Sequence, residues 1–203
     1  MDDNEQEYKG YIIRIEMDEN PIDPREWDNL GHMICFHRRY DLGDKHDMDI
    51  DELKELVKRK DVLALPLYIL DHSGLWMRTG HFDCDPAPHW DTSMVGYIYV
   101  TYEELRKEYS AKNITKAVLD KATRVLESEV STYSDYISGD VCGFIVEDTE
   151  GELVDSCWGY YGRQGVKDAI DEAKSIIAHL HVRWVEKLID AKVIEIKEEE
   201  VKD

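Results

Sequence analysis

Two long stretches with apolar residues three or four positions apart constrain the fold most. They cover residues 115–136 and 165–192, and in the second the apolar positions are Val166, Ile170, Ala173, Ile177, Leu180, Trp184 and Leu188. Such spacing puts the apolar side chains in one stripe on an α-helix, and that stripe must be buried against another element. Between the two stretches, GDVCGFIVED and ELVDSCWGYYG predict a β-hairpin that turns at residues 149–151. The fold must therefore combine long helices with hairpins.

Shorter elements fill the first half of the chain. Strands are predicted for the β-branched and aromatic runs at residues 8–17, 32–39, 62–70 and 94–101. Two short helices are predicted to start at Asp49 and Thr101, because each is followed three residues later by a glutamate, Glu52 or Glu104, as in a capping box. Strand–helix–strand repeats are few, so we predict an α+β fold with a mainly antiparallel sheet covered by helices.

The chain length suits a single domain. Its 203 residues are enough for one sizeable hydrophobic core, and no repeat or low-complexity linker divides it. We predict a disordered N-terminus over residues 1–7, one domain over residues 8–192 and a charged tail over residues 193–203.

The charge is strongly negative. The chain has 45 acidic and 25 basic residues, which gives a formal net charge of −20. Such a chain repels nucleic-acid phosphates and anionic membranes, so we expect it to bind neither directly. The acidity is explained either by solubility alone or by a surface that takes the place of nucleic acid on another protein.

The N-terminus and the cysteines bear on the compartment. The first residues, MDDNEQE, contain no basic and apolar run of the kind found in signal peptides, and no apolar run has the length of a membrane-spanning helix. The four cysteines are widely spaced. We therefore expect a cytoplasmic protein with reduced thiols.

One loop contains residue types that bind metals. In TGHFDCDPAPHWDTS, the side chains of His81, Cys84 and His89 could supply three of the four ligands of a zinc ion. The alternative is a strand connection in which Trp90 packs inward and aspartates accept hydrogen bonds from turn N–H groups. We favour a protein without a cofactor and keep zinc as the alternative.

No set of residues predicts a catalytic centre. Glycine-rich phosphate loops are absent, and Asp71, His72 and Ser73 are adjacent, whereas a triad converges from separate segments. We therefore favour a protein that is not an enzyme. A small hydrolase that uses the Asp71–Asp91 region, with or without a metal ion, is the first alternative.

Aromatic residues beside arginine or glycine suggest protein-binding surfaces. Trp27 lies two residues from Arg25 in a long loop, and Trp158, Tyr160 and Tyr161 stand among glycines at a predicted strand end. Aromatic and arginine side chains are the usual anchors of protein interfaces. We predict these five residues as the binding residues.

Several longer phrases resemble a known family. The phrases PREWDNLG, HRRYDLGD, DHSG, VGYIYVT, GDVCGFIVED and DSCWGYYG, spread over about residues 8–178, resemble uncharacterised proteins encoded by bacteriophages and bacterial mobile elements. In that family the stretch around His81 and His89 is shorter, so the resemblance does not extend to these two residues. The resemblance implies a phage accessory gene and no particular mechanism.

These observations predict a phage accessory protein that binds and inhibits a host protein. The host protein would be a defence enzyme or another enzyme that handles nucleic acid, and the acidic surface would stand in for phosphates. The second alternative to this function is a structural or regulatory component of phage replication.

Overall fold

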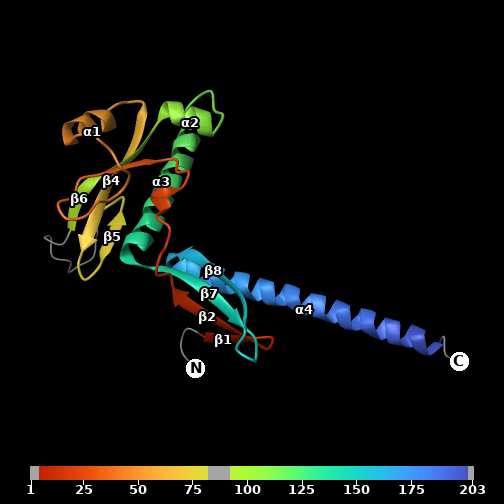
Figure 1. Ribbon diagram of the computed structural model, residues 1–203. Coiled ribbons are helices and arrows are strands. Elements are labelled where there is room, and N and C mark those ends of the chain that lie inside the picture. The colour runs from red at the N-terminus through yellow and green to blue at the C-terminus, as the bar shows by residue number, and fades with distance from the viewer. Residues whose placement is uncertain (1–4, 82–91, 201–203) are drawn as a thin grey trace. The chain divides into compact units, whose positions relative to one another are not determined.

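The computed structural model describes residues 5–81 and 92–200, and their side chains as far as residue 182 (Figure 1). Within these ranges the strands are β1 (Glu5–Tyr8), β2 (Tyr11–Met17), β3 (His32–Cys35), β4 (Val62–Asp71), β5 (Leu75–Arg78), β6 (Thr92–Thr101), β7 (Val141–Glu147) and β8 (Leu153–Tyr161). The helices are the 3-10 helix η1 (Pro24–Glu26), α1 (Ile50–Val57), α2 (Tyr102–Glu108), α3 (Lys116–Ser138) and α4 (Gly162–Glu200). All strand pairs are antiparallel, and the predicted α+β class is confirmed.

The chain divides into two compact units, where the sequence suggested one domain over residues 8–192. Unit 1 comprises Met1–Pro21 and Val141–Asp203, and unit 2 comprises Ile22–Asp140. Each unit has its own four-stranded sheet. The strands that were expected to form one sheet are therefore divided between two separate sheets.

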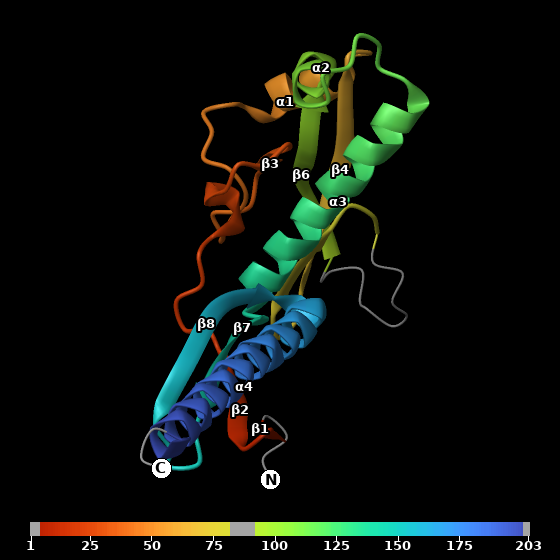
Figure 2. The same cartoon turned by 90° about the vertical axis from the view of Figure 1, so that its right-hand side faces the viewer.

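In unit 1 the strand order is β1-β2-β7-β8, and α4 lies along one face of this sheet (Figure 2). The buried residues between sheet and helix are Ile13, Phe144, Val146, Ala169, Ala173 and Ile177. The predicted strand 8–17 is interrupted at Lys9 and Gly10, which both have positive φ angles and form a tight turn. Strand β1 starts at Glu5, inside the segment predicted to be disordered, and α4 continues to Glu200, inside the predicted tail.

In unit 2 the strand order is β3-β6-β4-β5, and α3 packs on one face of this sheet (Figures 1 and 2). The core between sheet and helix includes Leu67 and Ile98 from the strands and Leu126 and Val130 from α3. Among the described residues of both units, no helix has an apolar stretch long enough to cross a membrane.

Both predicted capping boxes are present. At α1, the Asp49 carboxylate accepts hydrogen bonds from the N–H groups of Asp51 and Glu52, each at 2.8 Å, and Glu52 accepts one from the Asp49 N–H at 3.0 Å. At α2, Thr101 and Glu104 make the same reciprocal arrangement. The caps satisfy backbone donors that have no partner within the helix.

Replacing Asp49 by alanine should lower the free energy of unfolding by about 1 kcal/mol, because the first turn of α1 loses its cap. Asp51→Ala is the matched control. Its carboxylate is 89% exposed and contacts only the Lys54 ammonium in the described structure, so its loss should cost at most about 0.5 kcal/mol. Urea denaturation measures both, and equal losses would contradict the role of the cap.

Candidate functional site

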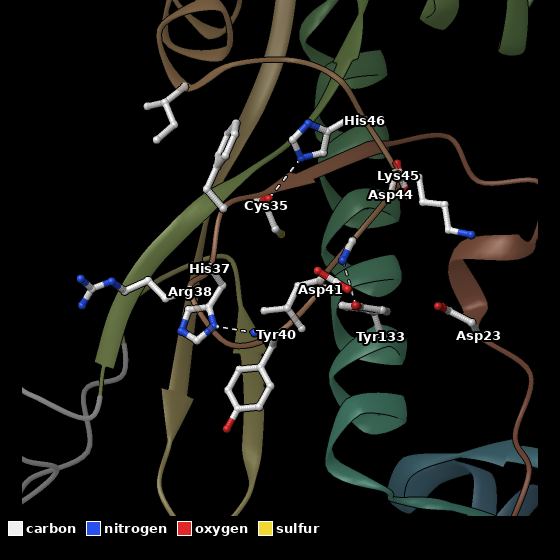
Figure 3. A pocket seen from close by; sticks show the side chains of 14 residues that line it. Asp23, Cys35, His37, Arg38, Tyr40, Asp41, Asp44, Lys45, His46 and Tyr133 are labelled. Carbon is white, nitrogen blue, oxygen red and sulfur yellow. Dashed lines mark hydrogen bonds between the residues drawn. The ribbon is translucent and has the colours of Figure 1, made fainter.

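A pocket of about 750 Å³ lies in unit 2 beside the loop that joins β3 to α1 (Figure 3). This loop supplies most of the wall, and Asp23, Ile50 and Tyr133 complete it. The volume is in the range of small-molecule sites. The pocket is therefore large enough to hold a small molecule.

The loop is fastened to the core by a glycine. The N–H of Gly43 donates to the Tyr133 hydroxyl at 2.8 Å, and Gly43 forms a bridge with Ile34 of β3. Its φ angle is +72°, and a Cβ atom there would collide with the carbonyl oxygen of Met33. Only glycine fits this position without strain, so residue 43 allows the loop to lie close against β3.

Arg25 and two carboxylates hold the loops around the pocket. The Arg25 guanidinium donates to both carboxylate oxygens of Asp44, at 2.7 and 3.1 Å, to Glu129 at 3.1 Å and to the Gly31 carbonyl at 2.6 Å. Asp44 also accepts from the Met33 N–H at 2.7 Å. The network joins η1, the pocket loop, β3 and α3.

The network places Arg25 in the interior rather than on a binding surface. Its side chain is only 5% exposed. Burial lowers the pKa of the guanidinium, but the bonds to Asp44 and Glu129 outweigh burial and raise that pKa above its ordinary value. Arg25 is therefore permanently charged, and among the described residues its guanidinium is engaged with Asp44, Glu129 and the Gly31 carbonyl.

Two histidines in the pocket have defined hydrogen bonds. His37 Nδ1 accepts the N–H groups of Arg39 and Tyr40, both at 3.3 Å, so its proton must be on Nε2. His46 Nε2 lies 3.1 Å from the carbonyl oxygen of Cys35, to which it can only donate. The buried Nδ1 of His46 has no hydrogen-bond partner among the described residues.

The thiol and the phenol of the pocket are held neutral. Burial, reinforced by the Asp44 charge, raises the pKa of Cys35 to about 12. Burial likewise raises the pKa of Tyr133 to about 12. At neutral pH these groups can offer hydrogen bonds, but Cys35 is no thiolate nucleophile. The arrangement suits binding of a small polar group better than covalent catalysis.

Trp27 lies beside a second hollow in unit 2. Its side chain is 46% exposed, and with Pro24, Val125 and Thr132 it lines a depression of about 350 Å³ on α3. The position between η1 and α3 gives this predicted binding residue a partly apolar, solvent-facing setting.

Trp158 stands on the face of the unit 1 sheet that is opposite to α4. Its side chain is 44% exposed. The register pairs Trp158 with Gly143 and Gly143 with Glu16, so these three residues form one row across β8, β7 and β2. The neighbouring row contains Arg14, which forms ion pairs with Glu5, Glu16 and Glu147. We call this surface the outer face.

The two tyrosines predicted with Trp158 have different surroundings. Gly159 has a φ angle of +87° and lies at a register shift, which turns Tyr160 toward α4. There the Tyr160 ring packs near Phe144, and its hydroxyl donates to Glu172 at 2.8 Å. Burial and bonds to Cys157 and Glu172 raise the Tyr160 pKa above its ordinary value. Tyr161 is half-buried opposite Val141. Of the three, Trp158 is the exposed one.

The predicted metal ligands are only partly described. His81 is exposed, and its ring lies beside that of Tyr68, with centroids 4.2 Å apart and the planes tilted by 40°. Cys84 and His89 lie outside the described residues. Within the described ranges, no group of three or more histidine, cysteine or acidic side chains could hold a metal ion. Asp71, from the region of the hydrolase alternative, pairs with Arg39 of the pocket loop.

The chain was compared with protein families, curated proteins and solved structures. No family model matches the chain, and no curated protein or solved structure matches it either.

Proposed function

We propose that this chain is an accessory protein of bacteriophages or mobile elements that binds a host protein and inhibits it. The host protein would be one that handles nucleic acid, and the acidic surface would occupy its nucleic-acid-binding groove. The observation that carries this proposal is the outer face of unit 1, where the exposed Trp158 adjoins carboxylates. The family resemblance supplies the phage context.

The charge distribution supports a basic partner. Unit 1 has 22 acidic and 10 basic residues, a net charge of −12, and unit 2 has 23 acidic and 15 basic residues, a net charge of −8. On the outer face, Arg14 is surrounded by three glutamates. Such a field attracts a positively charged groove and speeds its association.

Charge alone gives little specificity for one partner over another. The exposed aromatic side chains would supply this specificity. Exposed tryptophans are frequent centres of binding energy, because a large rigid ring is buried at a low cost in side-chain entropy. Trp158 and Trp27 offer such rings in the two units.

The test is a pull-down of the tagged chain from bacterial lysate, followed by a competition assay with the captured partner. We expect a stoichiometric partner that dissociates between about 0.1 M and about 1 M salt, because salt screens the attraction. The purified chain should then displace DNA or RNA from that partner. A complex that resists salt, or a partner whose nucleic-acid binding is unaffected, would contradict the proposal.

A charge-matched pair of variants locates the surface. Glu7 pairs with Ile12, two residues from Arg14 along β2, and so lies on the outer face. Glu7→Gln with Glu16→Gln removes two charges from this face, and Glu103→Gln with Glu108→Gln removes two from α2. The first variant should weaken the complex by about tenfold and the second by less than about twofold, although the net charge is the same. Equal effects would mean that only total charge matters.

A further inference from the structure

The row Trp158–Gly143–Glu16 on the outer face has the shape of a binding subsite. Gly143 has no side chain, and a Cβ atom built on it would lie 2.6 Å from Cδ2 of the Trp158 indole. The indole therefore rests on the bare backbone of β7. This support fixes the ring, while 44% of the side chain stays exposed.

Glu16 has the least neutralised carboxylate around Arg14. The Arg14 guanidinium is close to Glu5 at 2.9 Å and to Glu147 at 3.0 Å, but it lies 3.8 Å from Glu16. The Glu16 side chain is 42% exposed and has no other ion pair in the described structure. Its charge is therefore available to a cation from outside.

The spacing of the row suits one long cationic side chain. Trp158 and Glu16 are two strands apart, which is about 10 Å between backbones. The indole lies over the strand between them, so a cation on the ring would be within reach of the Glu16 carboxylate.

We propose that this row binds an arginine side chain of the partner, an inference that rests on the proposed function. The guanidinium stacks on the Trp158 indole and forms an ion pair with Glu16. Arginine fits better than lysine, because its planar and weakly hydrated guanidinium stacks on aromatic rings and pairs with carboxylates at the same time. Three glutamates surround the single arginine Arg14, so the outer face keeps a negative charge that complements the guanidinium of the partner.

The test is a titration of the isotopically labelled chain with N-acetyl-argininamide. The NMR signals of the indole N–H groups are monitored during the titration. Trp158→Phe identifies the Trp158 signal by its disappearance, and the Trp27 signal is the internal control. We expect the Trp158 signal to shift and the Trp27 signal to stay in place. N-acetyl-lysinamide should bind about two- to fivefold more weakly.

Glu16→Gln separates the subsite from general charge. This exposed substitution should leave the fold intact and weaken argininamide binding at Trp158 by about two- to fivefold, whereas Glu103→Gln on α2 should leave it unchanged. Equal shifts of Trp158 and Trp27, or equal effects of the two glutamine variants, would overturn the subsite. If the salt-sensitive host complex still forms while argininamide does not act on Trp158, the subsite is wrong and the proposed function stands. If neither is observed, both fail.

Discussion

Replacing Arg25 by alanine should lower the free energy of unfolding by about 3–5 kcal/mol, more than any other single substitution considered for this chain. The reason is the pair of carboxylates that the guanidinium neutralises. Glu129 is 11% and Asp44 25% exposed, so both would lose their cationic partner while most of each side chain is removed from water. The Gly31 carbonyl would also lose its hydrogen bond from Arg25.

Arg59→Ala is the matched control for this experiment. Arg59 also forms a close ion pair, with Asp61 at 2.6 Å, but both side chains are more than half exposed, and such pairs contribute little to stability because water screens them. Urea unfolding followed by circular dichroism compares the two variants. A loss for Arg25→Ala as small as that for Arg59→Ala would mean that water screens the network.

The features that the sequence predicted correctly are those whose causes are local. A capping box involves side chains and N–H groups within four residues, so Asp49 and Thr101 could be recognised as helix starts from neighbouring letters. The hairpin of β7 and β8 and the helix α3 also follow from patterns within a short window.

Features that depend on distant partners were not predictable in this way. Strand β2 pairs with β7, more than 120 residues later, and periodicity gives no information about which strands pair. The two-sheet arrangement therefore could not be read from the chain. Arg25 illustrates the same limit, since its partner Glu129 is 104 residues away. An arginine beside a tryptophan suggests an exposed anchor until that partner is known.

The structure also gives a physical meaning to two of the phrases on which the resemblance in the sequence rests. In PREWDNLG, Arg25 and Gly31 belong to the buried network, and in HRRYDLGD, Gly43 and Asp44 fasten the pocket loop. The one local signal for the loop is Gly43 itself, since glycine adopts positive φ angles without strain. These phrases therefore include residues that build the loop around the pocket.

The stability of unit 2 should decrease as the pH rises from about 9 toward 12, because of Cys35. Its pKa is 9.0 in the unfolded reference and about 12 in the folded chain, where burial, assisted by the Asp44 charge, disfavours the thiolate. Below pH 9 both states keep the proton, and the contribution to stability is complete. Above pH 9 the thiol loses its proton in the unfolded state but keeps it in the folded state until about pH 12, so rising pH favours unfolding. The expected loss is about 2–3 kcal/mol by about pH 11.

Cys35→Ala separates the contribution of the Cys35 thiol to the pH dependence from that of the Tyr133 phenol. The folded pKa of Tyr133 is also about 12, and Tyr133 is unchanged in the variant. The variant should be less stable than the original chain at neutral pH, because it leaves a cavity, yet lose less stability between neutral pH and about pH 11. Urea midpoints measured across that range give both slopes. Parallel slopes would show that the Cys35 thiol ionises as easily in the folded chain as in the unfolded one. The pocket wall at Cys35 would then be open to water, and this thiol would have to be reconsidered as a reactive group.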